Sequence, residues 1–150
     1  MRADRPVLCL ITDRRRLTSR LRQPEANWES LLLSQIEGAI DGGVDVVQIR
    51  ERDLDAVALA TLVRAALRLS GEHATQIIVN DRIDVAVAAA ANGVHLREAG
   101  IRTSAVRSRW PAPFVVGRSV HGPQGARAAE SLVHCAGTPV CSLIVGQGYT

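Results

Sequence analysis

The stretch GVDVVQIRERD, residues 43–53, joins a short apolar run directly to four charged residues. A run that is apolar on both faces is typical of a strand in a parallel sheet covered by helices. Its echo, NGVHLRE at residues 92–98, repeats the order of Gly, Val, a short strand, an apolar residue, Arg and Glu. A repeated unit of this kind indicates a barrel built from equivalent strand–helix modules.

Strand and helix patterns alternate on both sides of this stretch. Short apolar runs predict strands at residues 7–12, 44–49, 76–79, 94–96, 114–117 and 140–145. Helical spacing, caps and glycine stops predict helices at residues 27–40, 56–70, 84–91, 101–109 and 123–133. The polar residues 14–23 predict a loop. This α/β pattern leaves open a doubly wound sheet and an incomplete (β/α)8 TIM barrel of about five to six units. The absence of GxGxxG after the first strand disfavours a dinucleotide-binding fold.

The composition of the 150 residues fits one domain and excludes several kinds of site. All 18 basic residues are arginine, so this chain offers no Schiff-base lysine and no Walker-type phosphate lysine. Aromatic residues are scarce, which argues against a nucleic-acid partner that stacks bases. No run approaches the ~20 apolar residues of a membrane span. Three cysteines without a CxxC pair fit a cytoplasmic protein, and Cys9 is predicted to be a buried thiol.

Polar residues follow the predicted strands at their carboxyl ends, the edge at which ligands bind in parallel α/β folds. They include Gln48, Arg50 and Arg52 after the second strand, Asn80 and Asp81 after the third, and Ser119 and His121 after the fifth. The two amides suit a heterocycle, and Arg50 suits forked contact with a phosphate. Asp81 is a hard oxygen ligand for Mg²⁺, Ser119 can donate to a phosphate oxygen, and His121 can transfer a proton.

Other polar residues have structural explanations. Asp53 or Asp55 can cap the helix at residues 56–70, and Asp53 and Asp84 are the predicted helix caps. The arginines at residues 14–16 are predicted to lie in a solvated loop. His95 lies within a strand, where a histidine either packs in the core or lies at the rim of a site, and the sequence leaves both open.

Four motifs in order carry a family resemblance: LITDRR at residues 10–15, GVDVVQIRERDLD at 43–55, IIVNDRIDVAVAAAANGVHL at 77–96 and VVGRSVH at 115–121. Over residues 7–130 the chain resembles the thiamine phosphate synthase/TenI family. The resemblance implies a (β/α)8 barrel of thiamine (vitamin B1) biosynthesis that acts on small phosphorylated thiazole or pyrimidine compounds.

One activity of that family is thiamine phosphate synthase, which joins an aminopyrimidine diphosphate to thiazole phosphate and releases pyrophosphate with Mg²⁺. By resemblance, the residues that hold the pyrimidine diphosphate are Gln48, Arg50, Arg52 (where the family commonly has Lys) and Asn80, with Ser119 near pyrophosphate. Asp81 would bind Mg²⁺. The family's second Mg²⁺ carboxylate lies in a stretch like HLGQED, whereas residues 95–100 here read HLREAG and place Gly100 there. One carboxylate holds Mg²⁺ poorly against a diphosphate.

The sister activity is a TenI-like thiazole tautomerase, which aromatises a thiazole carboxylate phosphate by moving a proton and needs no metal. Its GRSVH motif stands at residues 117–121, and the resemblance implies His121 as the proton-transfer group. We therefore expect the tautomerase, because of this histidine and the missing carboxylate. The synthase stays open as an alternative, because Glu98 or Asp81 could complete a metal site.

The end of the chain departs from the family pattern. After residue 130 the family has a stretch like ADYVLFGTVF, whereas residues 135–150 read CAGTPVCSLIVGQGYT. We expect a C-terminally truncated barrel, produced by a frameshift near His134; a continuation of the barrel in another reading frame would test this. A truncated relic that binds ligands without turnover is a third alternative. The chain could also need a partner that supplies the missing strands, and a homo-oligomer is possible.

Overall fold

Five parallel strands form a sheet in the computed structural model, which describes residues 7–125. The strands are β1 (Cys9–Ile11), β2 (Val46–Ile49), β3 (Gln76–Asn80), β4 (Gly93–Leu96) and β5 (Val115–Arg118). The helical segments are α1 (Arg14–Leu21), the 3₁₀ helix η1 (Glu25–Asn27), α2 (Trp28–Asp41), α3 (Ala56–Ser70), α4 (Ile83–Ala88) and α5 (Thr103–Arg109). Each strand pairs in parallel with the next one in the chain, so the order in the sheet is the order in the sequence.

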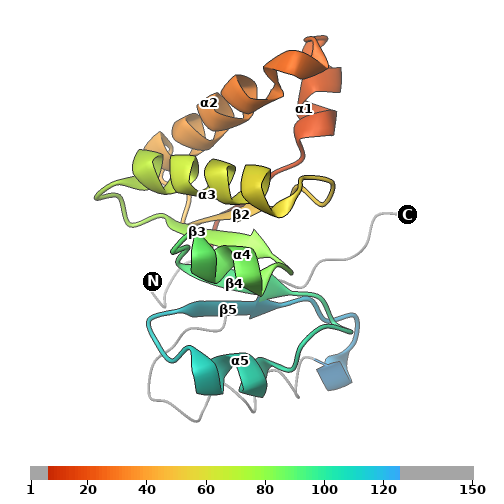
Figure 1. Cartoon of the computed structure of the whole chain (residues 1–150), viewed down its shortest axis with the longest axis vertical. Coiled ribbons are helices and arrows are strands. Elements are labelled where there is room, and N and C mark those ends of the chain that lie inside the picture. Colours follow the sequence, from red (N-terminus) through yellow and green to blue (C-terminus); the bar gives the residue numbers. More distant parts are fainter. Residues whose placement is uncertain (1–6, 126–150) are drawn as a thin grey trace.

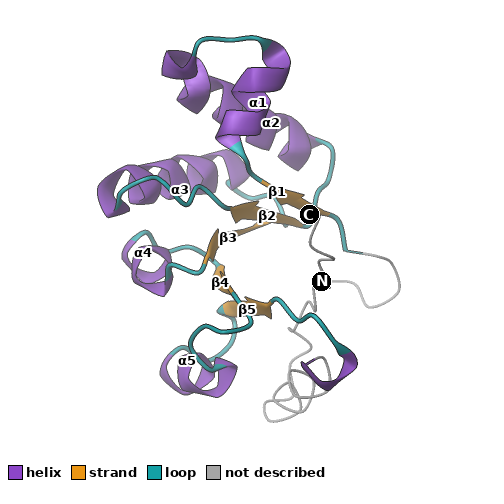
Figure 2. Cartoon of the chain, turned by 90° about the vertical axis from the view of Figure 1, so that its right-hand side faces the viewer, coloured by secondary structure: helices purple, strands orange, loops and turns teal. Residues whose placement is uncertain are grey.

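This strand order decides between the two architectures that the sequence leaves open. A doubly wound sheet reverses its strand order and carries helices on both faces. Here the order is sequential, and α2, α3, α4 and α5 all lie outside the curve that the strands describe (Figures 1 and 2). The fold therefore corresponds to five consecutive strands of the predicted (β/α)8 barrel with their outer helices. The strands of the described residues do not close into a barrel.

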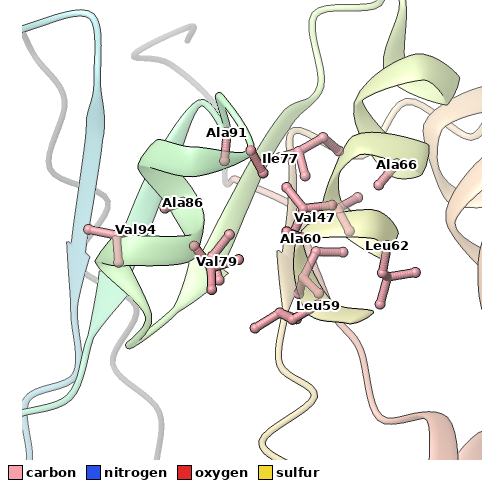
Figure 3. Close-up of a cluster of buried hydrophobic side chains, with 14 of the residues drawn as sticks. Val47, Leu59, Ala60, Leu62, Ala66, Ile77, Val79, Ala86, Ala91 and Val94 are labelled. Carbon is pink, nitrogen blue, oxygen red and sulfur yellow. The ribbon is translucent and has the colours of Figure 1, made fainter. Parts of the chain in front are cut away.

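The two faces of the sheet have different contents, because successive side chains of a strand point to opposite sides. The outer face is apolar and packs on the helices; Figure 3 labels Val47 and Ile77 of the strands beside Leu59, Leu62 and Ala66 of α3, and Val94 of β4 beside Ala86 of α4. Each such buried valine, leucine or isoleucine side chain contributes about 1.5–3 kcal/mol. The inner face holds a small apolar cluster of Val46, Ile78 and Val115, against which the partly buried Cys9 packs. The prediction of a buried Cys9 thiol is therefore only partly correct, and partial burial raises the pKa of this thiol.

The predicted strands and helices up to residue 117 agree with the structure to within three residues at each end. The prediction of a loop at residues 14–23 is wrong, because α1 occupies most of it. This helix carries few apolar residues, and it is stabilised at its start by Asp13, whose carboxylate accepts a hydrogen bond from the Arg16 backbone N–H at 3.0 Å. The predicted strand at 140–145, the divergent stretch 135–150 and all but the first turn of the helix at 123–133 lie outside the described residues.

The predictions for the aspartate caps are also corrected. Asp55, and not Asp53, caps α3, since its Oδ1 accepts from the N–H groups of Val57 and Ala58 at 2.9 Å. Asp84 lies inside the first turn of α4 and makes no cap; it pairs with Arg82 at 2.7 Å, which lowers the pKa of its carboxyl.

Candidate functional site

A cavity of about 750 Å³ opens at the carboxyl ends of the strands. Its lining comes mainly from the ends of the five strands and the loops that follow them, as expected for a barrel mouth, with Arg16 of α1 and Leu59 of α3 added. The polar lining residues are Thr12, Asp13, Arg16, Gln48, Arg50, Glu51, Arg52, Asn80, Asp81, Arg82, His95, Arg97 and Ser119. Six residues predicted to form the site are therefore together around one cavity: Gln48, Arg50, Arg52, Asn80, Asp81 and Ser119.

Two amides form the floor of the cavity. The Gln48 Nε2 amide donates to Asn80 Oδ1 at 2.8 Å, between neighbouring strands β2 and β3. Gln48 is 3% exposed, and its Oε1 is a buried oxygen without a hydrogen-bond partner. A buried unpaired acceptor costs about 1–3 kcal/mol. This oxygen therefore has unused acceptor capacity, in a residue that lines the cavity.

His95 stands beside these amides on β4 and bonds to Ser119. The His95 Nε2 lies 2.9 Å from Ser119 Oγ, while its Nδ1 is buried without a partner. Burial lowers the pKa of this imidazole, which favours the neutral ring. A Cβ at Gly117 would lie 2.7 Å from His95 Nδ1, so only glycine leaves room for the ring. His95 thus lines the cavity and positions the Ser119 hydroxyl.

The arginines at the mouth are held by a buried turn after β2. The Thr12 side chain is fully buried, and its Oγ1 accepts from the Arg50 backbone N–H at 2.9 Å. Glu51 is 5% exposed and accepts from the Arg14 backbone N–H at 3.1 Å; burial raises the pKa of its carboxyl, opposed by hydrogen bonds from Thr12 and Arg14. These contacts fix the backbone from which Arg50 and Arg52 project.

Arg14 reinforces the same turn and does not lie in a solvated loop. It is 8% exposed, its Nη2 lies 2.6 Å from Asp53 Oδ2, and its guanidinium stacks 5.1 Å from the centre of the Trp28 ring. Arg15, by contrast, is exposed and reaches the same Asp53 oxygen at 2.6 Å. The sequence could not separate these neighbours, because only the tertiary packing of α1 buries one of them.

Asp81 lies at the end of β3 and pairs with Arg97 from the end of β4. Its backbone adopts a left-handed conformation, φ 60°, held by its N–H, which donates to the His95 carbonyl at 2.7 Å. The Arg97 Nε lies 2.9 Å from Asp81 Oδ2. An ideal Cβ at Gly100 would lie 3.4 Å from Asp81 Oδ1, so a carboxylate at position 100 would have stood beside Asp81.

The residues at this edge do not fit a bound Mg²⁺. Asp81 is engaged with Arg97, and Gly100 supplies no ligand. Glu98, which could have completed a metal site, instead accepts from His121 Nδ1 at 2.6 Å. Within residues 7–125, no three His, Cys, Asp or Glu side chains gather in a group that could hold a metal ion.

His121 lies outside the cavity lining described above. Its side chain is 62% exposed, and both its backbone N–H and its Nδ1 contact the Glu98 carboxylate, which lowers the pKa of Glu98. The structure therefore brings six of the seven predicted site residues together and places the seventh at the rim. Sequence reasoning missed the pairing of Asp81 with Arg97, although their positions after adjacent strands were a usable signal.

Three comparisons with known proteins agree. A family model described as thiamine monophosphate synthase matches residues 8–134. A Geobacter sulfurreducens protein, provisionally named a thiamine-phosphate synthase, is 45% identical over 65% of this chain and 46% of its own. A thiamine-phosphate synthase of Solidesulfovibrio magneticus is 35% identical over 83% of this chain and 54% of its own.

The fold has a solved counterpart as well. A thiamine phosphate pyrophosphorylase from Pyrococcus furiosus superposes with a TM-score of 0.67 and 27% identity, covering 84% of this chain and 55% of that one. The chain spans about half the length of the curated relatives it matches. In the described part of the chain, no helix is both long enough and apolar enough to cross a bilayer.

Proposed function

The chain belongs to the thiamine monophosphate synthase family, and from this membership we propose that its cavity binds the aminopyrimidine diphosphate of a thiamine-phosphate synthase reaction. In that reaction the pyrimidine is joined to a thiazole phosphate and pyrophosphate leaves. The names of the relatives support the synthase better than the tautomerase that we expected from the sequence. Mg²⁺ belongs to the expectation for the synthase, but no step here depends on it.

The observation that carries this proposal is the amide pair at the cavity floor. The unpartnered Gln48 Oε1 is an acceptor, and the Asn80 amide, whose oxygen already accepts from Gln48, has N–H groups left to donate. An aminopyrimidine presents a matching edge, with an amino donor next to a ring-nitrogen acceptor. Such paired hydrogen bonds orient a ring and reject analogues that lack them.

The charged groups around the mouth suit the other half of the ligand. Breaking the bond between the pyrimidine substituent and the diphosphate leaves negative charge on the departing pyrophosphate. Arg50 and Arg52 line the cavity and can neutralise that charge through forked hydrogen bonds. Ser119 can donate to a phosphate oxygen when the His95 Nε2–H donates to the Ser119 hydroxyl. We assign these roles to Arg50, Arg52 and Ser119.

Isothermal titration of the aminopyrimidine diphosphate tests the proposal. Gln48→Ala should weaken binding about tenfold or more, because the ring loses one hydrogen bond and the orientation that it provides. Gln23→Ala removes an exposed glutamine outside the lining and should leave the affinity unchanged. Equal affinities for wild type and Gln48→Ala would refute the role of the amide pair.

The thiazole tautomerase is the second candidate, and one observation favours it. His121 is paired with a carboxylate at 2.6 Å, an arrangement that suits proton transfer. If this is the activity, metal-free turnover of a thiazole carboxylate phosphate should be lost in His121→Ala and kept in His73→Ala, at an exposed histidine outside the cavity lining. Absence of turnover in the wild-type chain, with pyrimidine diphosphate still bound, would favour the synthase-type ligand.

A further inference from the structure

The charge at the cavity is unusual for a site that would recruit a metal. The lining contains five arginines, Arg16, Arg50, Arg52, Arg82 and Arg97, against three carboxylates, Asp13, Glu51 and Asp81. Each carboxylate already has a partner within the chain: Asp13 caps α1, Glu51 accepts from Arg14, and Asp81 pairs with Arg97. The lining is therefore cationic without any metal, and it has no carboxylate left over to bind one.

Arg97 is the arginine that stands next to the one acid expected to hold a metal. Its Nε contacts Asp81 Oδ2 at 2.9 Å, and the side chain is otherwise 73% exposed. A guanidinium carries five N–H donors, so contact with one carboxylate oxygen leaves donors for a second anion. Arg97 lines the same cavity as Arg50 and Arg52 and is placed to meet the same ligand.

The loop after β4 carries Arg97, and several hydrogen bonds hold this loop against Arg118 and His121. Arg118 of β5 donates to the carbonyl of Glu98 and, at 2.9 Å, to the carbonyl of Ile101. His121 holds the Glu98 carboxylate through its backbone N–H and its ring. These bonds restrict the motion of the loop and fix the backbone of Arg97. Because this backbone is already ordered, less entropy is lost when the Arg97 side chain binds an anion.

From these contacts we propose that Arg97 takes the place of a divalent cation: it neutralises Asp81 and binds the diphosphate of the ligand directly, so that this site binds diphosphates without Mg²⁺. This proposal rests on the proposed pyrimidine diphosphate ligand and specifies how its phosphates are held. Gly100 belongs to the same arrangement, since a carboxylate there would stand next to Asp81 and compete for Arg97.

Binding of inorganic pyrophosphate, measured by isothermal titration with the full chain, tests the contact with phosphate. The wild-type affinity should be the same in EDTA and in Mg²⁺ to within about twofold. Arg97→Ala should weaken binding by about tenfold or more, the loss of a charge-assisted hydrogen bond. Arg97→Lys keeps the charge but loses the forked guanidinium, so its affinity for pyrophosphate should lie between those of the wild type and Arg97→Ala. Arg109→Ala, an exposed arginine of α5 outside the lining, should match the wild type.

Direct binding of Mn²⁺, followed by electron paramagnetic resonance without any phosphate, tests the exclusion of the metal. The double variant Arg97→Ala/Gly100→Asp should bind Mn²⁺ at least about tenfold more tightly than the wild type, because two carboxylates replace a carboxylate–guanidinium pair. Removing Arg97 also removes the Cγ that a Cβ at position 100 would approach at 3.2 Å, although the contact of that Cβ with the Arg97 carbonyl oxygen at 3.1 Å stays. Circular dichroism confirms that each variant is folded.

The outcomes separate this inference from the proposed function. Pyrophosphate binding that requires Mg²⁺, or Mn²⁺ binding by the wild type as tight as by the double variant, overturns the role of Arg97 and leaves the diphosphate ligand standing. No pyrophosphate binding in either buffer overturns the diphosphate ligand itself and the contact of Arg97 with it.

Discussion

The buried histidine His95 is expected to make the stability of this fold depend on pH. His95 is 4% exposed, and burial lowers the pKa of its ring in the folded chain. Between that lowered pKa and the usual value of the unfolded chain, the unfolded state binds more protons than the folded state. The stabilising contribution is therefore complete above the unfolded pKa and is lost as the pH falls toward the folded one.

We expect the wild-type free energy of unfolding to fall between pH 7 and pH 5, with His95 contributing at most about 1.4 kcal/mol per pH unit. His95→Gln has no titrating ring at this position and should show a shallower decline. The measurement is urea unfolding at several pH values, with His73→Gln at an exposed position as the matched control. Parallel curves for wild type and His95→Gln would show that His95 does not titrate as its burial requires.

The same scale shows what one sequence can and cannot predict about a site. Gln48, Arg50 and Asn80 were predicted correctly to lie at one cavity, because their positions at strand ends follow from the alternation of strands and helices. The burial of Arg14 and its pairing with Asp53 were not predicted, because both residues stand among charged neighbours that look alike in sequence. Which arginine is buried depends on the packing of α1 against Trp28, a contact between segments that pattern alone does not place.

At the scale of elements, the close approach of β4 and β5 depends on Gly93. A Cβ at this position would lie 2.1 Å from the Val115 carbonyl oxygen, a backbone atom that cannot move without displacing its strand. Gly93→Ala should therefore lower the free energy of unfolding by about 1–3 kcal/mol or more. The measurement is equilibrium urea denaturation.

Gly38→Ala is the matched control for this prediction. Gly38 lies in the last turn of α2, and a Cβ there would meet nothing within 4 Å. Alanine at this helical position should stabilise the chain by about 0.5–1 kcal/mol, since it restricts the unfolded state more than glycine does. If Gly93→Ala did not lower the free energy of unfolding relative to Gly38→Ala, the inference that β4 packs tightly against β5 at Gly93 would be wrong.

Elements with strong apolar patterns were predictable, and the exception has a physical reason. The helix at residues 56–70 was predicted with the observed bounds of α3, because an aspartate cap, apolar residues at helical spacing and a glycine stop all agree. For α1, the sequence RRRLTSRL contains only two apolar residues. Its stability comes from the Asp13 cap and from buried Arg14 and Thr18, and neither leaves a periodic apolar signal.

At the scale of the whole molecule, the cavity joins the ends of strands that are far apart in the sequence. Gln48 of β2, Asn80 of β3 and His95 of β4 line it beside Ser119, which follows β5. The sequential strand order and the helices on the outer face create this convergence. The parallel pattern alone left a doubly wound sheet open, and the internal repeat and the family resemblance indicated the barrel. A ligand that spans the cavity therefore contacts segments from across the described part of the chain and can stabilise them together.

This convergence predicts a rise in melting temperature when the anion site is filled. Pyrophosphate at about 100 times its dissociation constant should stabilise the folded chain by about 2.7 kcal/mol, if it binds only the folded state. For a domain of this size, that corresponds to a rise of several degrees in a differential scanning calorimetry experiment. Arg50→Ala should show little of this rise, since it removes a cation that lines the cavity. Sodium sulfate at equal ionic strength separates specific binding from general salt effects, and a rise equal to that with pyrophosphate would show that the anion stabilises the chain without occupying this site.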